Sequence, residues 1–368
     1  MTNMKLYPYF KLLCLACLLL AGGSRLYATT YKLVQVNSVE AGCKYVFVEG
    51  GRALKKEISS NILKYVNSYS TSNLDGNENY VWDVEATTGG FYLKKSNSEY
   101  LNNTSSTNMS FGSKTTVWTF TFTNGVALIS STSNGKRFLA WNATNGYKAY
   151  DYDSYIDNPN LGHNFTVYKL VTDITITSAK YATFCAEVGL DFSDTSAKVY
   201  TAKVENGKVK LTEIEGGIVP ANTGILIYKD VNVSVTISAA VKDNSATVSD
   251  NELVGTTEET TVSWEVGGRH NYILQTDSEG KAKFYKAKAE GAKLIANRAY
   301  LSTSATVSAH ELDITFDEEG ETTGISDAMR LNNNEEIKNK DFFNLQGQRV
   351  NANHKGIVIV GGKKVFNP

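Results

Sequence analysis

The residues with the clearest capacity for chemistry are aromatic side chains in a stretch rich in Asn, Gly and Asp, residues 140–160. An aromatic ring beside Asn and Asp acceptors suits a sugar, because the C–H face of the sugar packs on the ring while its hydroxyls take hydrogen bonds. Alternating aromatics are also the ordinary way to build a β core. The glycan- or protein-binding candidates that we single out are Trp141, Tyr147, Tyr150, Tyr152 and Tyr155.

Pairs of carboxylates are the second set of candidates. Asp83 and Glu85 stand two positions apart, as do Asp151 and Asp153, so in a strand each pair shares one face. Two carboxylates at the right separation can cleave a glycosidic bond. Because carboxylates are common on the solvated surface of a β protein, a secreted glycan-acting hydrolase that uses those of the first domain is the alternative function rather than the main one.

Three aspartates of the aromatic stretch, Asp151, Asp153 and Asp157, are weak candidates for a calcium site. A calcium loop of the EF-hand type needs oxygen ligands at alternate positions and a Gly at the turn. Tyr155 occupies the third ligand position and Ile156 stands where the Gly belongs. We therefore expect no metal and no other cofactor.

Motifs of the common enzyme classes are missing from the sequence. None of the four histidines has another His or Cys at metal-ligand spacing, and there is no Gly-x-Ser-x-Gly elbow or phosphate-binding Gly loop. We expect isolated surface or structural histidines, and a protein that is not an enzyme. The histidines are His163, His270, His310 and His354.

The first 28 residues predict export. Lys5 and Lys11 form a basic start, residues 12–21 are a short apolar run, and a small residue, Ala28, ends the segment. This order describes a secretory signal peptide cleaved after Ala28, whereas a membrane span needs about 20 apolar residues. A lipoprotein signal at Cys17 is the less favoured alternative, because no full hydrophobic stretch precedes that cysteine.

Charge and cysteine content narrow the partners. Removing residues 1–28 takes away three of the 37 basic residues and none of the 38 acidic ones, which leaves a net charge of −4. That balance argues against non-specific nucleic-acid binding, which needs a basic surface.

Two of the four cysteines, Cys43 and Cys185, remain after the signal peptide is removed. They could pair across a domain junction, but we favour two small buried apolar residues.

The elements that position the candidates are predicted to be strands. Residues 29–171 hold short alternating runs of β-branched and aromatic residues between Asn and Gly turns. Two segments repeat one outline around Trp82 and Trp118, 36 positions apart, and residues 31–80 could hold a third copy. Three such units suggest a β-trefoil-like or barrel domain. Residues 54–65 also allow a helix, but Ser59, Ser60 and Asn61 interrupt that pattern and favour strands.

The rest of the chain divides into three parts. Residues 172–318 carry regularly spaced strands, including a hairpin at Asn206-Gly207, and predict an antiparallel β-sandwich. Residues 319–341 form a polar linker, and residues 342–368 form a tail of two small hairpins. So short a tail cannot fold alone, so we expect it to pack on the second domain or to be held by a partner.

The tail resembles a known class of sequence. Residues 344–350, 355–360 and 362–365 are similar to the C-terminal tail of many Bacteroidetes secreted proteins, a type IX secretion sorting domain. The resemblance implies outer-membrane passage and surface display, with the export machinery as the partner of the tail.

The middle of the chain resembles an accessory β-module of such surface proteins. The similarity rests on residues 177–185, 219–224, 284–286 and 296–301. The first region is similar to uncharacterised N-terminal domains of the same group. These resemblances imply a location and no defined activity or ligand.

Together these features predict an exported, all-β, cell-surface or secreted protein that binds or builds rather than catalyses. Its expected partner is a glycan or a host or surface protein, with no nucleic acid and no transmembrane segment. The alternatives are the glycan-acting hydrolase and a purely architectural surface component that accepts another chain's strand.

Overall fold

The computed structural model describes residues 29–74, 78–243, 247–316, 342–344, 348–351, 356–360 and 363–367, the last two ranges as backbone only. The expected signal peptide (1–28) and the expected linker (319–341) lie outside these residues. The chain divides into two compact units, Met1–Thr315 and Phe316–Pro368. Within the described residues, no helix is both long and apolar enough to cross a membrane.

The first unit begins with a run of short strands, as predicted, and one helical turn, α2 (Tyr152–Tyr155). Residues 54–65 form strands β3 and β4 and no helix, which confirms the prediction for that segment. The strands are β1 (Tyr31–Val36), β2 (Lys44–Glu49), β3 (Arg52–Ser59), β4 (Ile62–Val66), β5 (Trp82–Thr87), β6 (Gly90–Ser96), β7 (Glu99–Ser105), β8 (Asn108–Gly112), β9 (Thr119–Thr123), β10 (Val126–Ser131), β11 (Arg137–Asn142), β12 (Gly146–Asp151) and β13 (Thr166–Ile176).

Six of these strands form a circuit of pairings that returns to its start. β2 pairs with β5, β5 with β6, β9 with β10, and β13 with β2. Isolated bridges complete the circuit: Phe91 of β6 pairs with Trp118, next to β9, and Ala127 of β10 pairs with Phe165, next to β13. Three hairpins, β3–β4, β7–β8 and β11–β12, continue from β2, β6 and β10.

A large buried ring recurs at equivalent places in this circuit. Trp82 opens β5 and Trp118 precedes β9, and their indole N–H groups donate to the carbonyl oxygens of Leu54 and Leu101, both at 2.9 Å. Phe165 holds the third place, directly before β13, and is also fully buried. The two tryptophans of the predicted repeat are thus placed alike, and Phe165, which lies outside residues 31–80, is a third buried ring directly before a strand of the circuit.

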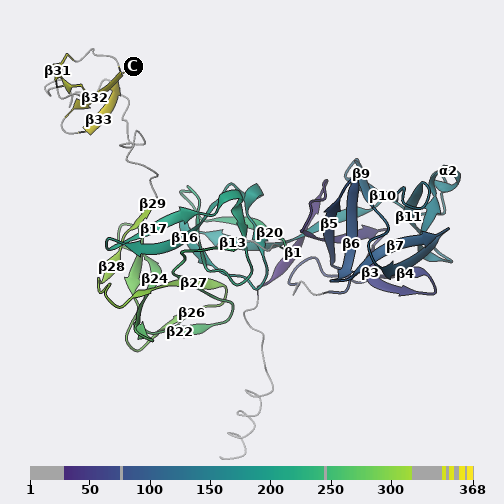
Figure 1. Ribbon diagram of the computed structural model, residues 1–368, viewed down its shortest axis with the longest axis horizontal. Helices are drawn as coiled ribbons and strands as arrows, with labels where there is room; N and C mark the ends of the chain where they lie inside the picture. The colour runs from purple at the N-terminus through teal and green to yellow at the C-terminus, as the bar shows by residue number, and fades with distance from the viewer. Residues whose placement is uncertain are drawn as a thin grey trace, which may run out of the picture. The chain divides into compact units, whose positions relative to one another are not determined.

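Strand β13 joins this circuit to the rest of the first unit (Figure 1). Its first half lies between β1 and β2, and its second half pairs with β20 (Val235–Val241). The sequence-based boundary between residues 171 and 172 falls inside this strand. A single hydrophobic cluster also spans the position, with Leu33 and Val46 on one side and Ile225 on the other.

The remaining strands of the first unit form antiparallel sheets, so the prediction of a β-sandwich is confirmed. Two 3₁₀ turns, Ser193–Thr195 and Glu215–Gly217, interrupt them. The strands are β14 (Tyr181–Phe184), β15 (Leu190–Asp191), β16 (Lys198–Glu205), β17 (Lys208–Glu213), β18 (Ile218–Val219), β19 (Ile225–Tyr228), β21 (Leu253–Thr256), β22 (Thr260–Val262), β23 (Glu265–Val266), β24 (Arg269–Thr276), β25 (Ala282–Lys286), β26 (Ala292–Leu294), β27 (Arg298–Ser304), β28 (Glu311–Leu312) and β29 (Ile314–Phe316).

The sandwich has three layers rather than two. In the sheet β14–β19–β16–β17–β29, strands β14, β16 and β19 carry consecutive buried residues and are thus covered on both faces. Ile225 and Ile227 of β19 pack toward β13 and β20, whereas Leu226 packs toward Tyr272 of the sheet β21–β27–β24–β25–β28. This explains why β19 reads Ile-Leu-Ile-Tyr without polar alternation, since strands covered on both faces are apolar throughout.

Local predictions in this part also hold. β16 and β17 pair across Asn206-Gly207, whose φ angles of 52° and 74° are the two positive values that a type I′ turn needs. Cys43 and Cys185 are both free and buried, so they do not pair across the chain.

The second unit contains one small sheet. Its strands are β30 (Phe342–Phe343), β31 (Arg349–Val350), β32 (Gly356–Val360) and β33 (Lys363–Asn367). The two expected hairpins are present as β30–β31 and β32–β33, and pairing of β30 with β32 joins them into the order β31-β30-β32-β33. The expected turn residues Gln346-Gly347 and Gly361-Gly362 lie outside the described residues.

Candidate functional site

The aromatic candidates are positioned by the hairpin β11–β12 and by α2. Tyr147 is fully buried in the core, and its hydroxyl lies 3.3 Å from the Glu49 carbonyl oxygen and 3.4 Å from a Glu49 carboxylate oxygen. Burial raises the pKa of Tyr147. Tyr150 is buried as well and packs with Phe138 and Leu161 in a small satellite cluster. Neither ring is available to a ligand.

Trp141 is half-buried, and the guanidinium of Arg52 lies over its ring. The guanidinium carbon of Arg52 lies 3.7 Å from the ring centroid of Trp141. Arg52 is held there by an ion pair of 2.8 Å with Glu49, a carboxylate that is itself buried. The indole nitrogen of Trp141 is buried and finds no hydrogen-bond partner among the described residues. Arg52 therefore occupies a ring face that a sugar would need.

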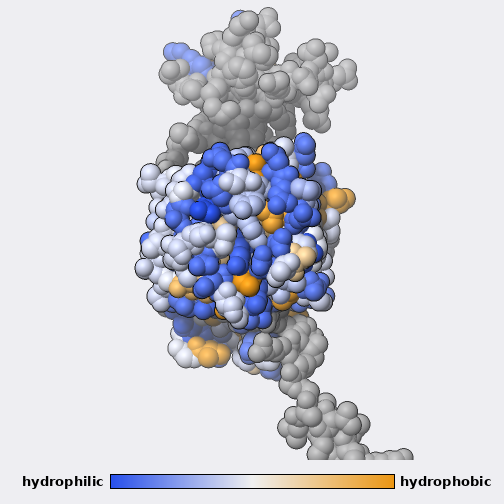
Figure 2. All heavy atoms as spheres, turned by 90° about the vertical axis from the view of Figure 1, so that its right-hand side faces the viewer, coloured by the Kyte–Doolittle hydropathy of each residue, from blue (hydrophilic) through white to orange (hydrophobic). Residues whose placement is uncertain are grey.

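Tyr152 and Tyr155 lie on the helical turn α2 at the edge of the same hairpin. The Lys136 ammonium sits 3.8 Å from the ring centroid of Tyr152, and Tyr155 packs edge-on against Tyr150. Tyr155 alone of the five candidates is exposed, at 45%. Figure 2 shows the face that includes this end of the first unit: it is mostly hydrophilic, and its hydrophobic residues are scattered. The five aromatics thus form no open platform.

The aspartates of this stretch have other partners. Asp151 caps α2 by accepting a hydrogen bond of 3.0 Å from the Ser154 backbone N–H. Asp153 pairs with Lys136 at 3.1 Å. In the described ranges, no three His, Cys, Asp or Glu side chains converge as a metal ion would need, so Asp157 does not complete a calcium site with them.

The carboxylates considered for hydrolysis are held as anions. Burial opposes ionisation of Asp83, but Lys44 and Lys56 outweigh it and hold the pKa of Asp83 below its usual value. A hydrogen bond from Lys114, with a second from the Tyr100 hydroxyl, lowers the pKa of Glu85. The general acid of a glycosidase needs a raised pKa, so neither carboxyl is suited to that role.

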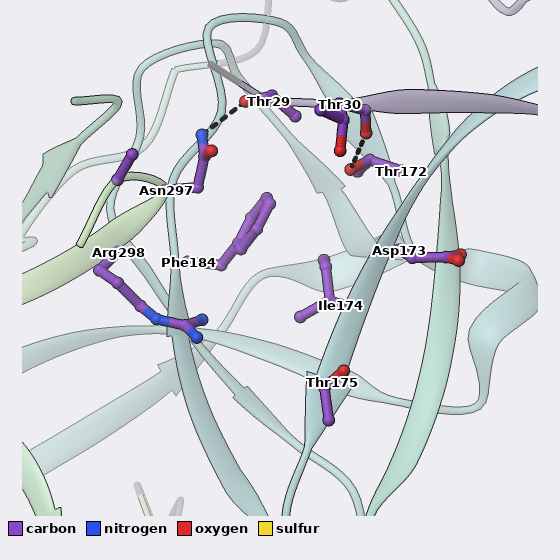
Figure 3. A pocket seen from close by; sticks show the side chains of 10 residues that line it. Thr29, Thr30, Thr172, Asp173, Ile174, Thr175, Phe184, Asn297 and Arg298 are labelled. Atoms are coloured by element: carbon purple, nitrogen blue, oxygen red, sulfur yellow. Dashed lines mark hydrogen bonds between the residues drawn. The ribbon is translucent and has the colours of Figure 1, made fainter. Parts of the chain in front are cut away.

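The first unit contains a cavity that the sequence did not reveal, which we call the β13 pocket. It has a volume of about 330 Å³. It lies where β13 meets the first described residues, the end of β14 and the beginning of β27 (Figure 3). Its lining is Thr29, Thr30, Thr172, Asp173, Ile174, Thr175, Phe184, Ala296, Asn297 and Arg298.

Arg298 is the only cationic side chain in this lining. Figure 3 shows its guanidinium pointing from β27 toward Ile174 and Thr175. Its Nη1 donates to the Thr183 carbonyl oxygen at 3.3 Å, and burial lowers its pKa. No carboxylate in the part of the chain that the structure describes lies within ion-pair distance of Arg298. A partly desolvated cation without a counter-ion therefore faces the cavity.

Two other polar residues of the β13 pocket are already engaged. Asn297 has a φ of 58°, and its amide donates to the Thr29 hydroxyl at 2.5 Å and to the Cys185 carbonyl oxygen at 3.0 Å. Asp173 points away from Arg298 in Figure 3. Its carboxylate forms an ion pair with Lys32 at 2.7 Å and accepts a hydrogen bond from the Ser238 hydroxyl at 2.6 Å. The only carboxylate of the lining is therefore neutralised from outside the cavity.

The sequence gives no signal that Arg298 is a site residue. The segment 296–301 stands out only for its resemblance to an accessory module, and a single Arg before a strand has no spacing signal. Its neighbours come from residues 29–30, 172–175 and 184, which only the fold brings together. No protein-family model, no curated protein and no solved structure matches the chain.

Proposed function

We propose that this is an exported, non-catalytic binding protein of the cell surface, and that the β13 pocket holds its ligand. The observation that carries the proposal is the half-buried guanidinium of Arg298, which faces a cavity of about 330 Å³ without a carboxylate partner in the described residues. A desolvated charge costs free energy unless a partner compensates it, and a ligand group can be that partner.

Binding is favoured over hydrolysis by the state of the carboxylates. The pocket lining holds one carboxylate, Asp173, which is engaged by Lys32 and Ser238. Asp83 and Glu85 lie elsewhere and are paired with lysines. A hydrolase needs one acid and one base flanking a single cavity, so the secreted glycan-acting hydrolase is the weaker proposal.

We also propose a β-trefoil for the N-terminal part of the first unit. The closed circuit of β2, β5, β6, β9, β10 and β13 supports it, as do the three hairpins that leave the circuit. The recurring buried rings of Trp82, Trp118 and Phe165 give the threefold repeat that such a domain requires. In this proposal the trefoil and the sandwich share strand β13.

The proposed location follows from the two ends of the sequence. A signal peptide cleaved after Ala28 takes the chain out of the cytoplasm, and the tail, which resembles a type IX sorting domain, leads it to the surface. The export machinery is then the partner of the tail, and a glycan or a surface protein is the partner of the body.

The test of binding uses the mature chain, residues 29–368, on a panel of small sugars and short peptides. Ligands that raise the unfolding temperature are then tested on Thr175→Trp, which places an indole at an exposed position of the pocket lining. We expect stabilisation of the wild type and not of Thr175→Trp.

Two matched variants complete this test. Thr177→Trp adds the same side chain at an exposed position just past β13 and should behave as wild type. Trp141→Ala examines the aromatic stretch and should keep the ligand. If no member of the panel stabilises the wild type, or if Thr175→Trp still responds, the β13 pocket is not the binding site.

A further inference from the structure

We infer that the β13 pocket selects an acidic monosaccharide, whose carboxylate faces Arg298 and whose hydroxyls face the threonines of the lining. This inference rests on the proposed function, because it names the class of ligand for the same pocket. It goes beyond that proposal by predicting which sugars bind and which do not.

The guanidinium sets the charge of the ligand. An Arg side chain has five N–H donors in a planar fork, and in the described structure Arg298 uses one of them, toward the Thr183 carbonyl oxygen. A carboxylate matches two parallel donors of such a fork and forms charge-assisted hydrogen bonds with both. The remaining donors of Arg298 thus suit a carboxylate better than a neutral hydroxyl.

The charges near the lining favour an acid that carries a single negative charge. Arg298 is the only cationic side chain of the lining, cleavage after Ala28 adds the α-ammonium of Thr29, and Lys32 is already paired with Asp173. A dianionic phosphate monoester would bring its second charge near the Asp173 carboxylate. A carboxylate brings one charge, which the Arg298 guanidinium compensates.

The rest of the lining suits a small hydroxylated molecule. A volume of about 330 Å³ is at the lower end for small-molecule sites, which span roughly 300–1,000 Å³. Thr30 and Thr175 offer hydroxyls that both donate and accept hydrogen bonds, and the Thr29 hydroxyl, which accepts from Asn297, retains a proton to donate. Phe184 and Ile174 add an apolar wall, against which the C–H face of a sugar can pack.

The site joins all three layers of the sandwich. Its lining comes from β13, from Phe184 at the end of β14 in the middle sheet, and from Arg298 at the start of β27 in the third sheet. A bound ligand would hold these strands together. Binding should therefore be visible as a rise in the unfolding temperature of the first unit as well as by calorimetry.

The experiment compares galacturonate and glucuronate with galactose and glucose on the mature chain, residues 29–368. We expect at least one acid to bind about 10- to 100-fold more tightly than its neutral counterpart, the ratio that one charge-assisted hydrogen-bonded pair supplies. Raising the salt concentration should weaken binding of the acid and leave the neutral sugar unaffected.

Three variants locate the effect. Arg298→Gln should lower affinity for the acid by about the same 10- to 100-fold and remove its preference over the neutral sugar. Arg298→Lys keeps the charge without the planar fork and should fall between wild type and Arg298→Gln. Arg269→Gln changes an arginine of the same sheet that does not line the pocket, and should bind as wild type.

The outcomes separate this inference from the proposed function. Equal binding of acid and neutral sugar, or an Arg298→Gln variant with unchanged preference, overturns the inference while the β13 pocket remains a binding site. Binding of peptides through their C-terminal carboxylate, with no binding of either acid, also overturns it. If Arg298→Gln fails to fold, the salt dependence of the wild type and the affinity of Arg298→Lys decide between these outcomes. If the wild type binds no sugar and no peptide, both the inference and the proposed function are wrong.

Discussion

Among single residues, Asp83 compensates two partly buried lysines at once. It is a mostly buried carboxylate that pairs with two lysines, Lys44 and Lys56, and Lys44 also lies 3.4 Å from Asp243. The pKa of Lys44 is raised, because Asp83 and Asp243 together outweigh burial, whereas burial lowers the pKa of Lys56. One carboxylate thus holds two ammonium groups, and Lys56 is the less well compensated.

Replacing Asp83 should therefore be costly. Asp83→Asn leaves Lys44 and Lys56 buried without their main counter-charge, and we expect a loss of about 3 kcal/mol in the free energy of unfolding at pH 7. Urea denaturation of the mature chain measures it. The matched control, Asp153→Asn, breaks an exposed pair with Lys136 and should change stability by less than about 0.5 kcal/mol.

The same residue predicts a dependence on pH. Because the pKa of Asp83 is lower in the folded than in the unfolded state, its contribution is fully present above the unfolded value, about pH 4, and is lost as pH falls through the folded pKa. The difference in stability between wild type and Asp83→Asn should shrink below about pH 4. A difference that is constant with pH would mean that the ionised carboxylate is not the source.

For single residues, the sequence indicated the aromatic candidates but not the side chains that pack against them. Arg52 covers Trp141, and Lys136 lies against Tyr152. Arg52 belongs to a hairpin that is distant in sequence, and a contact of this kind cannot be predicted from the residues around Trp141. The pocket around Arg298 was not predicted for the same reason, since its lining residues are distant in sequence.

Among the elements, the buried tryptophans at the start of β5 and directly before β9 lead to the next prediction. The indole N–H groups of Trp82 and Trp118 each satisfy one buried carbonyl oxygen, that of Leu54 and that of Leu101. Trp82→Phe and Trp118→Phe remove the donor and should each cost about 1–3 kcal/mol, since a buried acceptor is left unsatisfied. Equal losses, measured by urea denaturation, would show that the two positions are equivalent.

Trp141→Phe is the matched control for these variants. The indole nitrogen of Trp141 has no partner in the described residues, so its removal leaves no carbonyl oxygen unsatisfied. The loss in stability should be clearly smaller than for Trp82→Phe. A loss of equal size would mean that ring volume, rather than the hydrogen bond, determines the cost.

Element types were largely predictable, whereas the layers were not. Turn chemistry at Asn206-Gly207 and β-branched alternation placed β16, β17 and many other strands correctly. The apolar run of β19 is typical of a buried strand, but only packing shows that Ile225 and Leu226 face different sheets. Likewise, β13 is one continuous strand, although the sequence-based domain boundary between residues 171 and 172 falls within it.

For the whole molecule, the division into two units predicts separable roles. Residues up to Thr315 form one compact unit, and the small sheet β31-β30-β32-β33 belongs to the other. If the tail serves export, as its resemblance to a type IX sorting domain suggests, the body should fold without it. If the tail instead completes the body, its removal should expose apolar surface and lower stability.

Deleting residues 342–368 distinguishes these two roles. We expect an unchanged unfolding temperature and unchanged binding at the β13 pocket, because the lining of that pocket ends at Arg298, together with loss of surface display in the native host. Fusing residues 319–368 to an unrelated exported protein should confer display on it. A truncated chain that unfolds at a lower temperature yet still reaches the surface would contradict the sorting role and make the tail a structural part of the body.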